Sequence, residues 1–192
     1  MRSIGELPAR YEKIYAVDLQ KDRGKLLLVN GTAVGIAAIM VVIGLFFVPV
    51  TALFDIEGGV GFHALRFAAV ALGALAYTVL HEAVHGVAMR ICGTKKVKYG
   101  FRGGYAFAAS DDYYGKGAYI FIALAPVVLF GVMLGVLCAL LPADWFWVAY
   151  AIQIFNCSGA AGDLFVTARF ARMPRDILIR DYGVGMTVYA KK

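Results

Sequence analysis

Four long apolar stretches limit the possible folds of this sequence more than any other feature. They cover about residues 26–53, 67–91, 117–141 and 145–168. A helix needs about 20 residues to cross a hydrocarbon core of about 30 Å, and only helices and closed barrels satisfy their backbone polar groups inside lipid. The sequence therefore predicts an all-α membrane protein, a four-helix transmembrane bundle. Its length favours a single domain over residues 1–192.

The composition agrees with a lipid environment. Hydrophobic residues make up 61% of the chain and charged residues 17%, whereas soluble domains average about 45–50% and about 25%. The first apolar stretch follows a polar lead-in of residues 1–25 and has no small-residue cleavage site, so we do not expect a signal peptide there. The sequence gives no indication of the oligomeric state.

The basic residues predict the orientation of the helices. Except for Arg66, every Lys and Arg falls in residues 1–25, 90–116 or 169–192, and these segments share one side of a four-span topology. By the positive-inside rule, that side is the cytoplasm. We therefore expect a multi-pass protein with both termini, including a tail of residues 169–192, in the cytoplasm. The net charge of +6 is then a signal of topology, and we expect no nucleic-acid partner.

The loop between the second and third stretches has the pattern of a β-hairpin. From Lys96 to Ala109, aromatic residues alternate with polar or small ones around Gly103-Gly104. Two period-2 runs joined by Gly-Gly are typical of a hairpin. The predicted fold thus includes a small cytoplasmic β-hairpin between helices 2 and 3.

The second stretch contains His81-Glu82-Ala83-Val84-His85. Residues i and i+4 of a helix lie on one face, so both imidazoles can reach one metal ion. Glu82 is then placed to accept a proton from a metal-bound water, as in the H-E-x-x-H pattern of zinc peptidases. Ionisable groups inside a membrane span are costly and usually functional. The alternative is a polar cluster whose members satisfy one another.

A zinc site needs a third protein ligand. Of the acidic residues, only Glu82 and Asp163 fall within the predicted spans, which makes Asp163 the leading candidate. At 1.5 Å per residue, His81, His85 and Asp163 lie about 21, 27 and 27 Å from the outer ends of their spans. The alternative ligands are Asp111 and Asp112, if the cytoplasmic loop folds into the site.

Asn156 lies seven residues before Asp163, on nearly the same helix face. Because an unpaired amide in lipid is costly, we interpret it as a residue that binds the substrate backbone or orients a ligand.

These motifs resemble two families of membrane peptidases. The H-E-x-x-H helix with a later intramembrane Asp resembles the site-2 protease class of intramembrane metalloproteases. More closely, the chain resembles a small bacterial membrane family described as "putative zincin peptidases". The resemblance extends over nearly the full length, through residues 7–11, 15–22, 81–86, 123–126 and 156–163.

The resemblance to site-2 proteases implies His81 and His85 as zinc ligands, Glu82 as the general base and Asp163 as the third ligand. Those enzymes usually carry Asn, then Pro, then Leu-Asp-Gly in the later helix, whereas this chain has Gly162-Asp163-Leu164. The chain also has no PDZ-like insert. The close family places the protein in a bacterial plasma membrane.

The resulting hypothesis is a membrane-embedded zinc metalloprotease with one Zn²⁺. Its partners would be the lipid bilayer and a membrane-protein or peptide substrate, whose extended backbone would add to the edge of the hairpin. The alternatives are a metal-binding membrane protein without catalysis and, less favoured, a transporter of metal or small solutes. His, His and carboxylate suit zinc, although the sequence does not distinguish it from other divalent ions.

Overall fold

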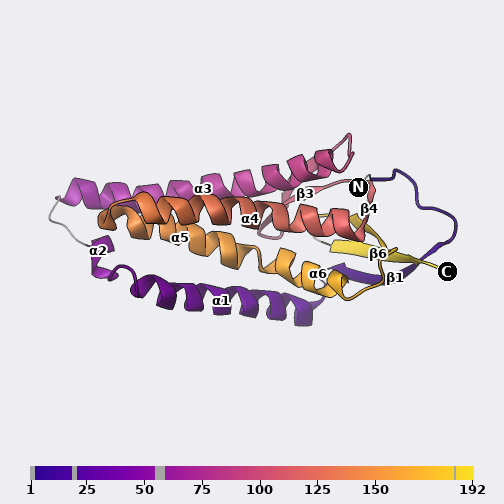
Figure 1. The fold of residues 1–192 in the computed structure, drawn as a ribbon, viewed down its shortest axis with the longest axis horizontal. Coiled ribbons are helices and arrows are strands. Elements are labelled where there is room, and N and C mark those ends of the chain that lie inside the picture. Colours follow the sequence, from indigo (N-terminus) through magenta and orange to yellow (C-terminus); the bar gives the residue numbers. More distant parts are fainter. Residues whose placement is uncertain (1–2, 19–20, 55–58, 184) are drawn as a thin grey trace. The chain divides into compact units, whose positions relative to one another are not determined.

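The computed structural model of the chain describes residues 3–18, 21–54, 59–183 and 185–192 (Figure 1). Its helices are α1 (Arg23–Leu45), α2 (Thr51–Phe54), α3 (Val60–Ile91), α4 (Lys116–Leu140), α5 (Ala143–Gly159) and α6 (Ala161–Ala171). Its strands are β1 (Tyr11–Asp18), β2 (Lys98–Arg102), β3 (Tyr105–Ala109), β4 (Tyr113–Gly115), β5 (Leu178–Asp181) and β6 (Gly185–Lys191).

Contacts within the chain define two compact units. Unit 1 comprises Met1–Val29, Leu80–Pro126 and Gly162–Lys192, and unit 2 comprises Asn30–Val79 and Val127–Ala161. Each unit is built from segments that are distant in the sequence. Helices α1, α3 and α4 each contribute residues to both units, so the division does not follow the boundaries of secondary structure.

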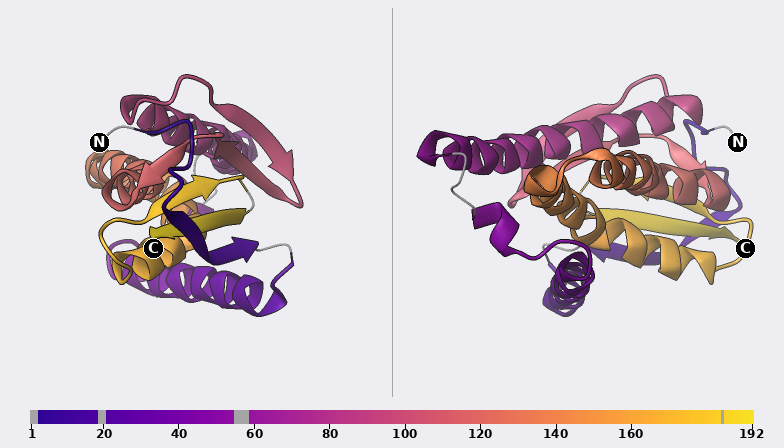
Figure 2. Two further views of the ribbon diagram at one scale, coloured as in Figure 1. Left: turned by 90° about the vertical axis from the view of Figure 1, so that its right-hand side faces the viewer. Right: turned by 60° about the vertical axis from the view of Figure 1, so that its left-hand side comes forward.

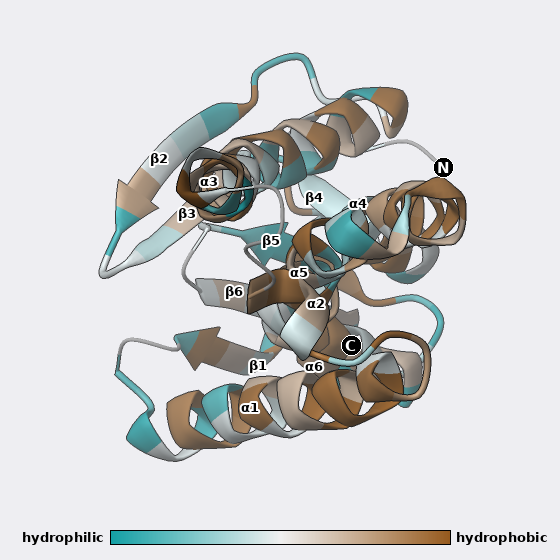
Figure 3. Ribbon diagram, turned by 90° about the vertical axis from the view of Figure 1, so that its left-hand side faces the viewer, coloured by the Kyte–Doolittle hydropathy of each residue, from teal (hydrophilic) through white to brown (hydrophobic). Residues whose placement is uncertain are grey.

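Three of the described helices, α1, α3 and α4, are long and apolar enough to cross a membrane, with mean hydropathies of 2.4, 1.6 and 2.8. Only 6%, 11% and 28% of their most apolar windows is buried within the protein, and Figure 3 shows hydrophobic residues around these helices. A helix that exposes apolar side chains on all sides is suited to lipid rather than to water. These helices are compatible with membrane association.

The expectation of four spans is wrong. The first predicted span extends to residue 53, but α1 ends at Leu45, and Pro49 separates it from the short α2. The predicted fourth span, 145–168, is interrupted at Ala160 (φ −77°, ψ 9°), where α5 ends and α6 begins. Gly159 and Gly162 flank the break, and each Gly costs a helix about 1 kcal/mol relative to Ala.

The expectation of an all-α fold is also wrong, because unit 1 contains a four-stranded antiparallel sheet in the order β1-β6-β5-β4. Strand β1 pairs with β6 from Tyr11↔Lys191 to Asp18↔Gly185, and Figure 2 shows these two strands side by side. Strands β1, β5 and β6 belong to the segments that were expected to form a polar lead-in and a tail, and β4 belongs to the predicted loop. The pairs β1–β6 and β4–β5 join strands that are far apart in the sequence, so no local pattern indicates these pairs.

The predicted hairpin is present in unit 1. Strands β2 and β3 pair from Lys98↔Ala109 to Arg102↔Tyr105. The turn consists of Gly103 (φ 61°) and Gly104 (φ 90°), the two positive φ angles that a type I′ turn requires. Its location on the cytoplasmic side stays a prediction.

Each unit has its own core. In unit 1, a buried apolar cluster joins α3, α4 and α6 to the sheet, with Met89, Tyr114, Phe170, Ile179 and Val188 among its members. In unit 2, the core is an aromatic group formed by Phe146, Trp147 and Tyr150 of α5. The larger core is thus the one that positions the candidate site described next.

Candidate metal centre

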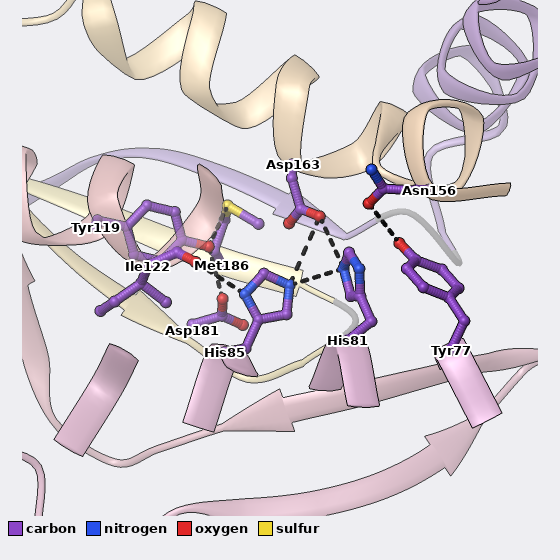
Figure 4. A network of polar contacts seen from close by, with 9 residues as sticks. All are labelled: Tyr77, His81, His85, Tyr119, Ile122, Asn156, Asp163, Asp181 and Met186. Atoms are coloured by element: carbon purple, nitrogen blue, oxygen red, sulfur yellow. Dashed lines mark hydrogen bonds and ion pairs between the residues drawn. The ribbon is translucent and has the colours of Figure 1, made fainter. Parts of the chain in front are cut away.

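The last turns of α3 carry His81, Glu82 and His85 into unit 1. The two histidines are buried, and their Nε2 atoms lie 3.1 Å apart. The rings meet edge to face, with centroids 4.7 Å apart. As the spacing predicts, one helix face presents both imidazoles to the same point (Figure 4).

Asp163 completes a group of three potential ligands. It lies in the first turn of α6, where a carboxylate is favoured by the partial positive charge of the helix N-terminus. Its Oδ2 lies 3.4 Å from Nε2 of His81 and 3.6 Å from Nε2 of His85. The break at Ala160 matters here, because it places Asp163 at the start of a new helix rather than deep in a continuous one.

The three donor atoms fit a zinc ion in both chemistry and spacing. They all lie within 4.8 Å of one another. Ligand atoms bound to zinc at 2.0–2.2 Å in a tetrahedron are separated by about 3.3–3.6 Å, close to the separations found here. Two imidazole nitrogens and one carboxylate oxygen are a donor set used by catalytic zinc sites, which keep the fourth position for water or substrate.

The backbone of α4 fixes the orientation of His85. Nδ1 of His85 lies 2.9 Å from the carbonyl oxygen of Ile122. A carbonyl can only accept a hydrogen bond, so Nδ1 carries the proton and Nε2 keeps its lone pair for a metal. The carbonyl is available because the residue four positions later is Pro126, which has no N–H to donate to it.

The hairpin contacts the candidate general base. The carboxylate of Glu82 accepts a hydrogen bond from the backbone N–H of Ala108 in β3. In a hairpin with a two-residue turn, the pair next to the turn, Arg102 and Tyr105, is hydrogen-bonded. Hydrogen-bonded and non-hydrogen-bonded pairs then alternate along the two strands, so the N–H of Ala108 points away from β2. The outer edge of β3 therefore faces Glu82.

Two glycines set the position of the hairpin. A Cβ at Gly86, the residue after His85, would collide with the hydroxyl of Tyr99 in β2. On the other strand, the ring of Phe107 occupies the space where a Cβ would stand at Gly183 (φ 91°). Because glycine has no side chain, Tyr99 can approach the backbone at Gly86 and Phe107 can approach the backbone at Gly183.

Sequence reasoning missed two polar residues beside the histidines, Tyr119 and Asp181. The Tyr119 hydroxyl donates to Oδ2 of Asp181 at 2.6 Å, and Oδ1 of Asp181 accepts from the N–H of Gly183 at 2.7 Å. Burial raises the pKa of the Asp181 carboxyl above its ordinary value, and the two hydrogen bonds oppose this rise. No local signal could have found Asp181, because the β4–β5–β6 pairing alone brings it here (Figure 4).

The two alternative ligands have other partners. Asp111 forms ion pairs with Lys98 at 2.6 Å and Arg180 at 3.3 Å, and these cations lower the pKa of its carboxyl. Asp112 accepts a hydrogen bond from Ser3 at 3.0 Å. Among the described residues, the group of potential metal ligands contains Asp163 and neither loop aspartate.

Asn156, the predicted substrate-binding residue, belongs to unit 2 and is fully buried. Its Oδ1 accepts from the Tyr77 hydroxyl at 3.1 Å, and its Nδ2 donates to the Val127 carbonyl at 3.1 Å and to Gln153 at 3.3 Å. These bonds join α3, α4 and α5 within unit 2. The substrate role stays a prediction, and it would require Asn156 to exchange one of these partners.

Comparison with known proteins gives one finding. A family described as "Putative zincin peptidase" matches residues 74–178, more than half of the chain. The matched range contains His81, Glu82, His85 and Asp163, and the family implies zinc. No curated protein and no solved structure matches the chain.

Proposed function

The chain belongs to the "putative zincin peptidase" family, and from this premise we propose that it is a membrane-embedded zinc peptidase. One observation carries the proposal, namely that Nε2 of His81, Nε2 of His85 and Oδ2 of Asp163 converge beside Glu82. A purely structural metal site has no need of an adjacent carboxylate. The same group in a non-catalytic protein or a transporter would leave Glu82 without a role.

The proposed roles follow from the atoms present. His81, His85 and Asp163 would hold the zinc ion. When bound, zinc supplies a Lewis acid that lowers the pKa of water and polarises a peptide carbonyl. The carboxylate of Glu82 would take the proton from the attacking water and return it to the amine nitrogen of the leaving peptide. Ile122 would keep the proton of His85 on Nδ1.

The substrate we propose is an extended peptide segment in or beside the membrane. Strand β3 has an outer edge near Glu82, and an added strand would use its outward N–H and C=O groups. The backbone groups of Ala106 and Ala108 point outward on that edge. Because the N–H of Ala108 already donates to Glu82, a substrate strand would use the N–H and C=O of Ala106 and the C=O of Ala108. An extended backbone is what a peptidase must present to its metal and base.

We further propose that the polar part of unit 1 lies on the cytoplasmic side. Every Lys and Arg except Arg66 belongs to unit 1, which supports this side under the positive-inside rule. The pairing of β1 with β6 supports the placement of both terminal segments on the same side. Helices α1, α3 and α4, which are long and apolar enough, would cross the bilayer.

The decisive experiment is the metal content of the detergent-purified protein, for wild type, His85→Ala and Asp163→Ala. We expect about one zinc per wild-type chain and loss of zinc from both variants, because each removes one of three ligands. Asp112→Asn is the matched control and should keep its zinc. Loss of zinc from the control but not from Asp163→Ala would move the third ligand to the loop. A folded wild type that takes up no zinc would refute the proposal.

A further inference from the structure

Unit 1 contains a pocket of about 730 Å³ apart from the metal ligands. It is lined by the end of β1, the start of α1, the start of β6 and the turn of the β2–β3 hairpin. Six charged residues line it: Asp18, Lys21, Asp22, Arg23, Lys25 and Arg102. Four of the six are basic, so the pocket carries an excess of positive charge.

The two acidic residues are already paired. Asp22 forms an ion pair with Lys25 at 2.7 Å and accepts from the backbone N–H of the same residue. Asp18 lies 3.7 Å from Lys21. Each of the two aspartates is thus paired with a lysine, and the excess positive charge of the pocket comes from its two arginines.

In the described part of the chain, the side chains of Arg23 and Arg102 form no ion pair or hydrogen bond with another residue. The guanidinium group presents a planar fork of donors that matches phosphate oxygens. Arg23 begins α1 directly after Asp22, whose carboxylate already caps this helix through the N–H of Lys25. The two guanidinium groups are therefore the part of the pocket lining that is left to attract an anion.

The location of the pocket suggests where the anion comes from. Arg23 is the first residue of a helix that is apolar enough to span a membrane, so the pocket would lie at the level of the lipid headgroups. Anionic lipids attract basic residues near the surface by about 1 kcal/mol each. Tyr182 and Thr187 add hydroxyl groups to the same lining.

We propose that this pocket binds a phosphate group, presented by an anionic phospholipid headgroup or by a soluble phosphate. The proposal does not depend on peptidase activity or on the metal. It gives the protein a second ligand, separate from the substrate, at the membrane surface.

The test is thermal unfolding of the full-length protein in non-ionic detergent, with three probes added separately. The probes are dioctanoyl phosphatidylglycerol, dioctanoyl phosphatidylcholine and inorganic phosphate. At about 100 times the Kd, we expect phosphatidylglycerol to raise the unfolding midpoint by about 5–10 °C. Phosphatidylcholine, which has no net charge, should have little effect. An equal shift with inorganic phosphate would support the pocket and identify soluble phosphate as the source.

The variant Arg23→Gln/Arg102→Gln should need at least roughly tenfold more phosphatidylglycerol for the same shift. Arg172→Gln/Arg175→Gln is the matched control, because it removes the same charge from exposed residues outside the pocket. The control should respond like wild type. Equal weakening in both double variants would mean general charge attraction, and no shift in wild type would mean no site. Either result would overturn the proposal.

Discussion

The two units divide the properties of the protein between them. Unit 1 contains every described strand, the metal-ligand group of His81, His85 and Asp163, and every Lys and Arg except Arg66. The described elements of unit 2 are all helical, and its buried amide, Asn156, has its partners within the unit. Helix α3 belongs to both, with Val60–Val79 in unit 2 and Leu80–Ile91 in unit 1. One helix can therefore be apolar support along part of its length and a chemical site along the rest.

The sharpest way to test this division is Glu82→Gln in unit 1. We expect cleavage of quenched fluorescent casein to fall about 10²–10⁴-fold, the usual contribution of a general base. Zinc content should not change, because Glu82 is not one of the three grouped ligands. The control Asp111→Asn, an exposed acid that has other partners, should retain activity. If Glu82→Gln lost its zinc, the separation of ligand from base would be wrong.

A second change tests the backbone support of His85. In Pro126→Ala, residue 126 gains an N–H that can bond to the Ile122 carbonyl and compete with Nδ1 of His85. Loss of the hydrogen-bond partner of a metal-binding histidine typically weakens metal affinity about 10–100-fold. We expect a weakening of this size, and competition with a chelator would measure it. Pro49→Ala, a proline in unit 2, is the control and should leave affinity unchanged. Unchanged affinity in Pro126→Ala would show that the carbonyl does not orient the histidine.

A change in unit 2 should have the opposite effect, lowering the stability of the protein without changing its zinc content. Asn156→Ala leaves the hydroxyl of Tyr77 and the carbonyl of Val127 without this partner, at a cost of about 1–3 kcal/mol. The unfolding midpoint should fall by roughly 2–4 °C for each kcal/mol, while zinc content stays at the wild-type level. Thr78→Ala, an exposed residue whose hydroxyl bonds within its helix, should change stability by less than about 0.5 kcal/mol. Loss of zinc from Asn156→Ala would break the division between the units.

The smallest expected effect is at Asp181. Burial raises the pKa of this carboxyl in the folded state. The fold therefore loses stability as the pH rises from the ordinary pKa of an aspartate to the raised pKa, and the loss is complete above the raised pKa. In metal-free protein, Asp181→Asn should therefore be more stable than wild type at pH 7, by about 1 kcal/mol or less. The difference should shrink as the pH falls through the raised pKa. Thermal unfolding of both proteins at several pH values measures this difference in stability. A difference that does not change with pH would contradict the prediction.

How much was predictable depends on whether the signal was local. The long apolar helix α3 and the hairpin around Gly103-Gly104 follow from short-range patterns. The approach of Asp163 to the two histidines was instead inferred from the acidic residues that fall within the predicted spans. Hydrophobic length predicted one long final helix, but Gly159 and Gly162 flank a break that divides it. The level of Asp163 was thus inferred from a continuous helix that does not exist.

The sheet could not be predicted in the same way. Lys13 and Glu12 make β1 look like a polar leader, and only its partner β6 turns it into a strand. Asp181 was missed for the same reason. The carbonyl of Ile122 gives no side-chain signal at all, and only the proline four residues later indicates that it is free to bond elsewhere.

The pairing of β1 with β6 has a consequence for biosynthesis. Strand β1 leaves the ribosome before any of the apolar helices, yet its partner is translated after all of them. The candidate metal ligands, the last of which is Asp163, are also synthesised before β5 and β6. A nascent chain therefore has its ligands before it has the sheet that surrounds them.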